Sequence, residues 1–377
     1  MTILTVNTGS SSVRLAAFTY DGRLKEVANT RHDLSACDPK TMLGKFRETH
    51  GLAQIRAAAH RVVHGGGTLT TSCLIDDQVE HEIDRLSPLA PLHNPVSLRW
   101  IRATREVLGA GVSQVAVFDT AFFTDLPEVA RTYAIPHELG KKHALLRYGF
   151  HGLAHQAMWL GWCNLKADTS RPGAPQELKG RERIISFQLG SGCSVTATEN
   201  GTPRDTSMGF SPLEGLVMAT RSGDIDPGLI TYLQREEDLS PEKLDELLNE
   251  QSGLSGVSGR SGDMRQLLHS QDEWSQLAVE LYCYRARKYL GAYLAVLGGA
   301  EAVIFGGGVG ENVPEVREKI LAGMQWCGIE VDSTKNRDSN GLSRISGEGS
   351  RVEVWVVPVD EAAILAREAV KILDLST

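Results

Sequence analysis

A strand–polar loop–strand pattern occurs twice in the chain, about half its length apart, and it restricts the fold more than any other feature. Ile3 to Val6 is apolar, Asn7 to Ser12 is polar, and Val13 to Thr19 is apolar again. The same order returns in residues 184–198, and the strings VNTGSSSV and FQLGSGCSV share the Gly-Ser step and its setting. Two halves that each open with a hairpin predict two similar α/β domains facing each other across a cleft.

Between and after the two hairpins, the hydrophobic pattern alternates between strands and helices. Further strands are predicted at 114–118, 302–305 and 352–357. Helices are predicted at 241–249, at 272–297, from Pro314, and from Asp360 to about Leu373. The polar segment 165–180, with its proline, glycine and lysine, is the candidate surface loop or domain connection.

Charge and motif content exclude several functional classes. Lysine and arginine total 39 against 47 aspartate and glutamate, so the net charge is −8 and no basic field favours nucleic acid or anionic lipid. Neither GxxxxGK[ST] nor a GxGxxG after a strand occurs, which excludes the two common nucleotide-binding fingerprints. The length of 377 residues corresponds to roughly two or three domains.

Cysteine usage and the opening residues indicate the compartment. The six cysteines are Cys37, Cys73, Cys163, Cys193, Cys283 and Cys327. They form no CxxC pair, which argues against a zinc ribbon or a disulfide framework and fits a reducing cytosol. The opening MTILTVNTGS has no basic or apolar signal-peptide region, and glycines and Glu301 interrupt the apolar stretch 289–309. We therefore expect a cytoplasmic protein without a membrane span.

Three loops have a composition suited to holding phosphates. They are Asn7–Ser12, Leu189–Gly192 and Gly306–Gly310, each rich in Gly, Ser or Thr and each after a predicted strand. Glycine lets backbone N–H groups approach phosphate oxygens, and hydroxyls add donors. Gly-Ser turns are also common without any ligand. Three such loops in one alternating chain favour the phosphate-binding interpretation.

A predicted strand end at 60–64 carries several polar side chains. Because side chains alternate along a strand, His60 and His64 lie on one face, and Arg61 and Val63 lie on the other. The glycines at 65–67 then end the strand. This strand end therefore belongs to a cationic, histidine-rich set of candidate residues.

Three other histidines lie in conspicuous settings. His93 lies in the rigid turn Pro-Leu-His-Asn-Pro. His151 and His155 are four residues apart, a spacing that zinc ligands also use, but neither HExxH nor a cysteine accompanies them. Ordinary packing is therefore favoured over metal binding at this pair.

One arginine and two acids complete the candidates. Arg221 is framed by Thr, Gly, Asp and Pro with nothing apolar to cover it, so it suits contact with an anion better than an ordinary surface arginine. Asp119 ends an apolar run, where α/β sheets place functional groups. Glu361 opens the last helix, and taken alone it reads as a first-turn acid favoured by the helix dipole.

Nine strings of the chain form a recognisable series: VNTGSSSV, HRVVHGG, APLHNP, FDTAF, RYGFHG, DTSMGFSPLEGL, TRSGDIDP, FGGGVGEN and VPVDE. In their order and approximate spacing, the chain resembles the acetate kinase family. The resemblance runs from residue 3 to the last helix. It implies two duplicated actin-like (ribonuclease H-like) α/β domains around a central cleft, as in sugar kinases, actin and heat-shock ATPases. The domains expected are 1–122 completed by 363–377, and 123–362.

The resemblance implies a role for each matching side chain. Asn7 and Glu361 match the positions that hold Mg²⁺ (or Mn²⁺). Arg61 and Arg221 match two arginines that hold the carboxylate and the transferred phosphoryl group. Arginine suits that task because its planar fork matches both anions.

Three further positions match catalytic ones. Asp119 matches a residue assigned as proton donor or acceptor, and here we expect it to orient its neighbours because acetate arrives deprotonated. His151 matches the transition-state stabiliser, and His93 matches a further histidine near the phosphoryl group. The residues that match the apolar pocket for the acyl methyl group are Val63, Leu92, Phe150 and Pro212.

The nucleotide side is implied in the same way, with departures. The matching residues are Gln188, Leu189, Gly190, Ser191 and Gly192 for phosphate; Asp263, Met264 and Arg265 for adenosine; and Gly308, Val309, Gly310, Glu311 and Asn312 for the adenine side. Gln188 and Ser191 stand where the family has His and Asn. Arg14, which we place on the donor side, replaces a lysine, and Phe123 replaces a common histidine.

We therefore expect an acetate kinase that reversibly transfers the γ-phosphoryl group of ATP to acetate, giving acetyl phosphate and ADP. The resemblance further implies a homodimer and a role in acetyl-CoA biosynthesis. The alternatives are a propionate- or butyrate-type kinase, and the same reaction with pyrophosphate as donor. A non-catalytic nucleotide-binding protein of the actin type would need none of Arg61, His151 and Arg221.

Overall fold

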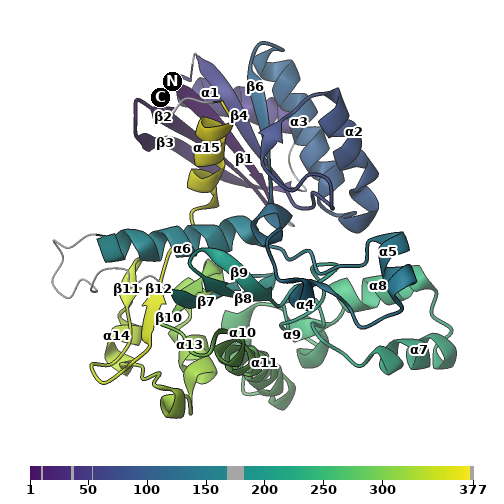
Figure 1. The fold of residues 1–377 in the computed structure, drawn as a ribbon, viewed down its shortest axis with the longest axis vertical. Coiled ribbons are helices and arrows are strands. Elements are labelled where there is room, and N and C mark those ends of the chain that lie inside the picture. The colour runs from purple at the N-terminus through teal and green to yellow at the C-terminus, as the bar shows by residue number, and fades with distance from the viewer. Residues whose placement is uncertain (10–11, 35–37, 53, 168–181, 374–377) are drawn as a thin grey trace. The chain divides into compact units, whose positions relative to one another are not determined.

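The computed structural model describes residues 1–9, 12–34, 38–52, 54–167 and 182–373 (Figure 1). The chain forms two compact units. Unit 1 comprises Met1–Thr124, Phe150–Leu153 and Asp360–Thr377, and unit 2 comprises Asp125–Gly149 and Ala154–Val359. The first part of unit 1 thus ends at Thr124 and its last part begins at Asp360, whereas the boundaries expected from the sequence are 122 and 363. It also takes in a short segment around His151.

Unit 1 is built on a six-stranded sheet with the order β3-β2-β1-β4-β6-β5. Its strands are β1 (Thr2–Thr8), β2 (Ser12–Tyr20), β3 (Leu24–Asp33), β4 (Ile55–Val62), β5 (Cys73–Leu74) and β6 (Ser113–Phe118). β1, β2 and β3 are antiparallel neighbours, whereas β4 and β6 run parallel to β1. The first predicted hairpin is confirmed, with Thr2 opposite Thr19 and Thr8 opposite Val13.

Unit 2 has a second six-stranded sheet, with the order β11-β12-β10-β7-β8-β9. Its strands are β7 (Arg183–Leu189), β8 (Cys193–Glu199), β9 (Thr202–Thr206), β10 (Ala302–Gly306), β11 (Ser343–Arg344) and β12 (Glu353–Val356). The second predicted hairpin is also confirmed, with Arg183 opposite Glu199 and Leu189 opposite Cys193.

The two sheets have the same topology when one order is read backwards. In each, an antiparallel meander of three strands is followed by two strands parallel to the first strand, and a short antiparallel strand closes the edge. Parallel neighbours require crossover connections, which helices supply. The prediction of two similar α/β domains, each opening with a hairpin, is confirmed.

Helices cover both faces of the unit 1 sheet. They are α1 (Pro39–Thr49), α2 (Asp77–Arg85), α3 (Asn94–Leu108) and α15 (Glu361–Ile372), with short 3₁₀ turns η2 (Ser87–Leu89) and η3 (Asp119–Phe123). Alternating residues of β2 point to opposite faces of the sheet. Leu15 packs in a core with α1 and α3, whereas Ala16 packs with Ala362 and Ala366 of α15. Figure 1 shows α15 in yellow, lying across this sheet.

Unit 2 holds most of the helices. They are α4 (Glu128–Arg131), α5 (His137–His143), α6 (Gly152–Ala167, which begins in unit 1), α7 (Pro227–Glu236), α8 (Pro241–Glu250), α9 (Gly253–Ser258), α10 (Met264–Leu268), α11 (Glu273–Leu297), α12 (Gly307–Asn312), α13 (Pro314–Leu321), η4 (Gln325–Cys327) and α14 (Ser333–Arg337). Trp162 of α6 packs with Ile184 and Ile304 of the sheet. The long helix α11 packs against β8.

Most predicted helices and strands are present, and several predicted loops need correction. The helices predicted at 241–249, at 272–297 and from Pro314 are α8, α11 and α13, and the last one is α15, with Asp360 as its N-cap. The loop predicted at Gly306–Gly310 is wrong, because Gly307–Asn312 form the helix α12. The segment 165–180 was predicted as a loop, but its first residues belong to α6, and 168–180 lie outside the described residues.

Of the helices in the described ranges, none combines the length and the apolar character that crossing a bilayer requires.

Candidate active site

Arg61 and Asp119 form a buried bidentate ion pair in unit 1. Arg61 Nε donates to Asp119 Oδ1 over 3.0 Å, and Nη2 donates to Oδ2 over 2.6 Å. Asp119 is fully buried, and Arg61 is only 9% exposed. Two parallel N–H···O bonds hold the planar guanidinium in one orientation. The third nitrogen, Nη1, then points to the end of β1, where it donates to the Thr8 carbonyl over 3.3 Å.

The sheet explains why these two side chains meet. Arg61 is the last residue but one of β4, and Asp119 directly follows β6. These strands are parallel neighbours, with Val62 opposite Phe118. Both side chains therefore lie at the carboxyl ends of adjacent strands, where α/β sheets carry their functional groups.

A short segment after Gly149 packs on Asp119. The His151 backbone N–H donates to the Asp119 carboxylate. His151 has a φ of 59°, which is rare for a residue with a side chain. A Cβ on Gly152 would lie 2.0 Å from the Asp119 carbonyl oxygen. Only glycine therefore fits at position 152.

Burial and charge act in opposite directions on this ion pair. Burial raises the pKa of the Asp119 carboxyl, and the Arg61 guanidinium opposes that rise. Burial alone would lower the pKa of Arg61, but the carboxylates of Asp119 and Glu361 raise it above its usual value. Because arginine stays protonated, an uncharged Asp119 would leave a buried cation without compensation. The pair is therefore held as Arg⁺ and Asp⁻.

Asn7 and Glu361 extend this pair into a connected set. Asn7 Nδ2 donates to Glu361 Oε2 over 2.6 Å, and Asn7 Oδ1 accepts from Arg61 Nη1 over 3.4 Å. Glu361 Oε2 also lies 4.0 Å from Arg61 Nη1. Asn7 was expected in a loop, but it belongs to β1, and Glu361 is the first residue of α15. The structure thus joins residues from both ends of the chain.

Residues that the sequence analysis missed fix the turn after β4. The Asn94 side chain binds the backbone of His64 twice, accepting from its N–H over 3.2 Å and donating to its carbonyl over 3.0 Å. The Gly65 N–H donates to Thr120 Oγ1 over 3.0 Å. Asn94 and Thr120 lie in the strings APLHNP and FDTAF, directly beside residues that were selected. That proximity is the sequence signal that could have identified them.

The four expected acyl-pocket residues divide between the units. Val63 and Phe150 are buried in unit 1, whereas Leu92 is 53% exposed there. The Phe150 ring lies edge-on to His64, with 5.5 Å between ring centroids. Burial lowers the pKa of His64 to about 4, so this ring is neutral at physiological pH. Pro212 belongs to unit 2.

His93 and Arg14 occupy different parts of unit 1. His93 is the N-cap residue of α3 and is partly buried. Arg14 lies on β2, where Nη2 donates to Glu26 Oε2 over 3.0 Å and Nη1 lies 3.5 Å from Asp360 Oδ1. Two carboxylates therefore balance the charge of Arg14.

In unit 2 the expected phosphate loop is shorter than predicted. Gln188 and Leu189 belong to β7, so the turn consists of residues 190–192. The Gly190 N–H donates to the Gly192 carbonyl over 3.1 Å. The Ser191 carbonyl accepts from the Ala219 N–H over 3.0 Å, which ties this turn to the segment that leads to Arg221.

The helix α12 lies next to that turn. Gly307 has a φ of 79°, and a Cβ there would lie 2.6 Å from the Leu189 carbonyl oxygen. Glu311 Oε1 accepts from the N–H of Gly307 over 3.0 Å and from the N–H of Val359 over 3.1 Å. The expected adenine-side residues 308–312 therefore lie in a short helix capped by one of their own side chains.

Arg317, which the sequence analysis missed, supports the end of α12. It is fully buried and donates to the carbonyls of Gly310 over 2.8 Å and Glu311 over 3.0 Å. Its other nitrogens bind Asn336 and Ser339. Burial lowers the pKa of Arg317 to about 10. Its charge is satisfied by oxygen acceptors along the chain.

The expected adenosine residues open the short helix α10. Asp263 is its N-cap, and Oδ1 accepts from the N–H of Arg265 over 2.8 Å and of Gln266 over 3.3 Å. Met264 is buried, whereas Arg265 is exposed. Asp263 thus has a structural role as the cap of α10, and this role is enough to explain an aspartate at this position.

Arg221 differs from Arg61 in its partners. Its Nη1 donates to the Pro212 carbonyl over 3.4 Å and lies 3.9 Å from Met218 Sδ. Within the described parts of the chain it forms no ion pair with a carboxylate. Burial lowers the pKa of its guanidinium. The sequence-based expectation that nothing apolar covers it is wrong, because Met218 lies against it.

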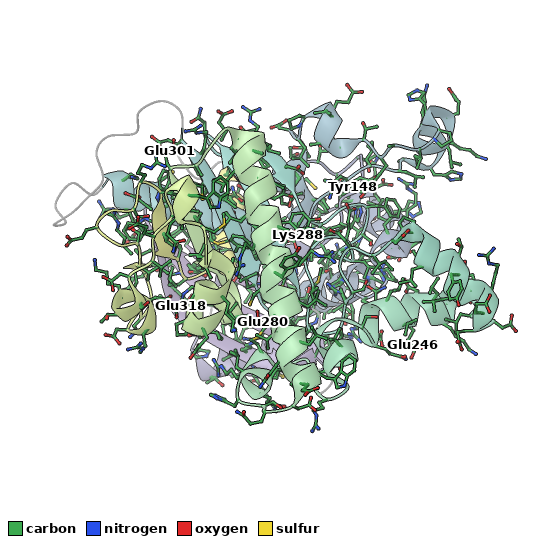
Figure 2. All side chains as sticks on the ribbon, turned by 90° about the horizontal axis from the view of Figure 1, so that it is seen from below. Tyr148, Glu246, Glu280, Lys288, Glu301 and Glu318 are labelled. Atoms are coloured by element: carbon green, nitrogen blue, oxygen red, sulfur yellow. The ribbon has the colours of Figure 1, made fainter. Side chains whose placement is uncertain are left out.

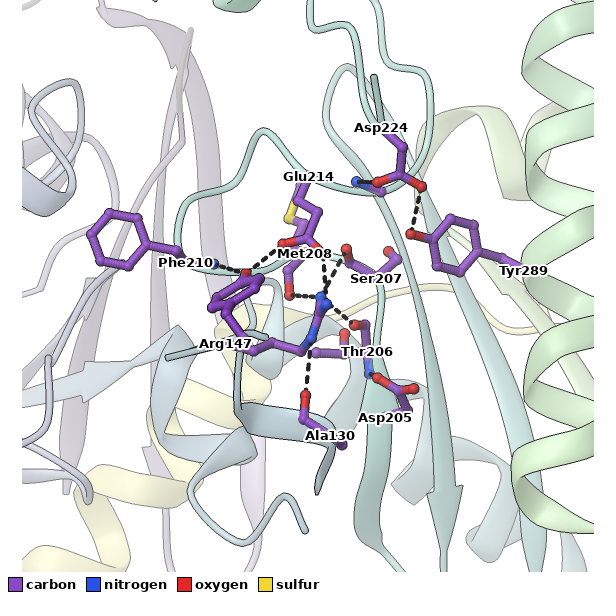
Figure 3. Close-up of polar contacts among 12 residues, drawn as sticks. Ala130, Arg147, Asp205, Thr206, Ser207, Met208, Phe210, Glu214, Asp224 and Tyr289 are labelled. Carbon is purple, nitrogen blue, oxygen red and sulfur yellow. Dashed lines mark hydrogen bonds and ion pairs between the residues drawn. The ribbon is translucent and has the colours of Figure 1, made fainter. Parts of the chain in front are cut away.

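Arg147 fixes the loop that leads to Pro212, as Figure 3 shows. It donates to the carbonyls of Thr206 (3.0 Å), Ser207 (3.3 Å), Met208 (3.2 Å) and Ala130 (3.2 Å), and to Glu214 Oε1 (2.5 Å). Tyr133 Oη donates to Glu214 Oε2 and accepts from the Phe210 N–H over 2.7 Å. Arg147 opens the string RYGFHG but was not among the predicted site residues.

His155 occupies a buried position in α6. Nδ1 lies 2.8 Å from Ser186 Oγ, and Nε2 lies 2.8 Å from Ser194 Oγ. Its role is to pack α6 on the sheet of unit 2, as the sequence analysis favoured. Among the described residues, no group of three or more His, Cys, Asp or Glu side chains could hold a metal ion.

Comparison with known proteins places these features in a family. The model of the acetokinase family matches residues 39–367. The acetate kinase of Chloroherpeton thalassium is 47% identical over 327 residues, which cover 84% of this chain and 75% of that protein. The crystal structure of Porphyromonas gingivalis acetate kinase has a TM-score of 0.85 and 35% identity, with 99% of each chain covered.

A propionate kinase is similarly related. The crystal structure of the Francisella tularensis propionate kinase has a TM-score of 0.85 and 33% identity, and covers 98% of this chain and 99% of that one. The family match covers most of the chain, and the duplicated sheets agree with it. This chain therefore belongs to the acetokinase family, kinases that transfer a phosphoryl group to a carboxylate.

Proposed function

We propose that this protein transfers the γ-phosphoryl group of ATP reversibly to acetate, giving acetyl phosphate and ADP. The observation that carries the proposal is the connected set Asn7, Arg61, Asp119 and Glu361 at the carboxyl ends of the unit 1 strands. Its guanidinium can bind a carboxylate, and its side-chain oxygens can coordinate a divalent cation.

Arg61 is proposed to bind the acetate carboxylate, and Asp119 to hold Arg61 in place for it. Because the guanidinium is already fixed, less entropy is lost when acetate binds and is oriented. One acetate oxygen forms a bond to the γ-phosphorus while the bond from that phosphorus to the bridging oxygen breaks, and ADP leaves with the electron pair. Acetate arrives deprotonated, so the step needs no general base.

Arg221 and His151 are proposed to stabilise the transferring phosphoryl group, with His93 near it. Arg221 has no carboxylate partner within the described chain, so its charge is available to an external anion. Donors aimed at developing charge act most strongly where water is largely excluded, and Arg221 is partly buried.

A divalent cation fits the donors present. Glu361 offers a carboxylate and Asn7 an amide oxygen, and Mg²⁺ commonly binds through one or two carboxylates, waters and substrate phosphates. Asn7 and Glu361 would therefore hold Mg²⁺ or Mn²⁺. When bound, the cation would neutralise phosphate oxygens.

The donor is proposed to be ATP. The turn 190–192 and Gln188 would contact phosphates, and the segments 263–265 and 308–312 would bind adenosine, for which a pyrophosphate enzyme would have no use. Arg14 is the weakest of the proposed donor contacts, because Glu26 and Asp360 already balance its charge.

The acyl group is proposed to be acetyl, bound against Val63, Leu92, Phe150 and Pro212. The structural likeness to a propionate kinase keeps propionate as the second candidate. Branched Val63, which is buried, is the residue proposed to limit chain length. We also propose, from the resemblance, a cytoplasmic enzyme that contributes to acetyl-CoA biosynthesis.

We propose a homodimer that uses an exposed apolar face of α11. Trp274, Leu277, Tyr284 and Val296 are about half exposed or more, and their spacing places them on one side of this helix. Figure 2 shows α11 as the long helix that carries the labels Glu280 and Lys288. Exposed apolar side chains that gather on one face commonly mark contacts between proteins. A Tyr284→Asp variant should then sediment as a monomer at concentrations where the unchanged protein is dimeric.

A hydroxamate assay for acyl phosphate tests the proposed reaction. Purified protein is given acetate, propionate or butyrate, each with ATP or with pyrophosphate, in the presence and absence of Mg²⁺. We expect the highest kcat/KM with acetate and ATP, and no turnover after chelation of Mg²⁺. Faster turnover with propionate or with pyrophosphate would overturn the corresponding assignment.

A further inference from the structure

We infer that Arg147, Tyr133 and Glu214 form a clamp that positions the Arg221 guanidinium through the Pro212 carbonyl. This inference rests on the proposed function, in which Arg221 contacts the transferring phosphoryl group. None of the three clamp residues is proposed to touch a substrate. They are positioning residues, and all of them lie in unit 2.

The clamp holds both ends of a short loop. Arg147 binds the carbonyls of 206–208 at the loop's start and Glu214 at its end. Tyr133 joins the two parts, since it accepts from the Phe210 N–H and donates to Glu214. Burial and the Glu214 carboxylate raise the pKa of the Tyr133 hydroxyl, so it stays a donor at neutral pH. Pro212 lies between these fixed points.

The loop has little room for another conformation. A Cβ on Gly209 would lie 1.7 Å from Glu214 Oε2 and 2.0 Å from Tyr133 Oη. Beyond Glu214, the Gly215 N–H donates to Asp224 Oδ1 over 2.8 Å, and Asp224 Oδ2 accepts from Tyr289 Oη over 2.8 Å (Figure 3). The clamp therefore fixes the Pro212 carbonyl with respect to the segment that carries Arg221.

Arg221 needs this support because it lacks the partner that Arg61 has. Asp119 binds Arg61 through two short hydrogen bonds, whereas Arg221 donates to the neutral Pro212 carbonyl over 3.4 Å. One long hydrogen bond orients a planar fork weakly unless its acceptor is rigid. A rigid neutral acceptor also leaves the positive charge uncompensated, so that it remains available to the phosphoryl group.

The first test removes one hydroxyl from the clamp. Tyr133→Phe should lower kcat roughly 10- to 100-fold, since small misplacement of a catalytic group costs up to about 100-fold, and should leave the KM for ATP within about twofold. Tyr148→Phe is the matched control, because its hydroxyl donates to the Ala144 carbonyl (2.8 Å) outside the clamp. It should keep the kcat of the unchanged protein.

A merely structural role would give a different pattern. In that case Tyr133→Phe would lower the melting temperature while kcat stayed within about twofold of the unchanged protein at a temperature where both are folded. That outcome would overturn the inference. Arg147→Lys supplies a second variant, since lysine keeps the charge but loses the fork that reaches several carbonyls. We expect it to lower kcat as Tyr133→Phe does.

A double-mutant cycle separates this inference from the proposed function. Glu214→Gln should lower kcat in the unchanged background and have no further effect in the Arg221→Ala background, because the clamp acts through Arg221. Equal effects in both backgrounds would overturn the inference and leave the role of Arg221 intact. If Arg221→Ala itself leaves kcat unchanged, the proposed role of Arg221 fails instead.

Discussion

The two units have the same strand order but carry different kinds of functional group at corresponding strand ends. Asn7 near the end of β1 corresponds to Gln188 near the end of β7, since each stands just before the turn of its hairpin. The neighbouring parallel strand ends with Arg61 and Val62 in unit 1 but with Gly306 in unit 2. One scaffold thus supports side-chain chemistry in one unit and close backbone approach in the other.

The same contrast holds for the charges. Arg61 in unit 1 is locked to Asp119, whereas Arg221 in unit 2 has only neutral acceptors within the described chain. A locked pair contributes orientation, and removing one member leaves a buried charge. An arginine without a carboxylate contributes charge to an incoming anion. The comparison predicts that mutations in the two units affect different measurable quantities.

Breaking the Arg61–Asp119 pair should have the largest effect on stability. Asp119→Ala leaves the Arg61 guanidinium buried without its main partner, which typically costs about 3–5 kcal/mol in the free energy of unfolding. Chemical denaturation followed by circular dichroism measures this loss. Glu106→Ala, which removes an exposed ion pair with Lys40, is the control and should leave the unfolding midpoint nearly unchanged. A similar midpoint for Asp119→Ala would show that Glu361 compensates Arg61 alone.

Arg221→Ala should show the opposite balance. Losing a donor used in the transition state costs about 2.7–4 kcal/mol of activation free energy, or roughly 10²–10³ in kcat. The free energy of unfolding should change little, because Arg221 has no ion pair to break among the residues that the structure describes. Steady-state kinetics and denaturation of the same preparation measure both quantities. Activity within threefold of the unchanged protein would contradict the assignment of Arg221.

The hairpins could be predicted from sequence because their signals are local. Apolar runs of suitable length flank a polar turn in both, and strand pairing then follows from chain order. The glycine run after β10 shows the limit of such reasoning. Glycine disfavours helices, so a loop was predicted, but Glu311 caps the helix and Arg317 binds its last carbonyls. These contacts come from packing, which no local pattern reveals.

The candidate site likewise contains residues that could be predicted from the sequence and residues that could not. Asn7, Arg61, Asp119 and Glu361 were selected from strand ends and from the family resemblance, and the structure joins them. Arg147 was missed, because its partners lie at 130, 206–208 and 214, far from it in sequence. An arginine that binds backbone carbonyls leaves no sequence signature, since any residue type supplies a carbonyl.

A smaller effect is expected from changing a unit 1 residue of the proposed acyl pocket. Val63→Ala enlarges a buried site by two methyl groups, and one methylene is worth roughly 1–3 kcal/mol in such pockets. We expect kcat/KM for propionate relative to acetate to rise by about 10-fold at most. Val27→Ala, at an exposed position of β3, is the control. An unchanged ratio would place the acyl pocket elsewhere.

The smallest effect should come from Gln188, the unit 2 counterpart of Asn7. Its Oε1 is buried without a hydrogen-bond partner in the described chain, and its amide never carries the charge that histidine can. The backbone turn that follows is intact, so most phosphate contact should survive any change here. Gln188→His should raise kcat/KM for ATP, and Gln188→Ala should lower it, each by roughly two- to fivefold, as one hydrogen bond typically gives. Initial rates over a range of ATP concentrations measure this. A lower kcat/KM for Gln188→His, or faster turnover of the unchanged protein with pyrophosphate than with saturating ATP, would contradict the donor assignment.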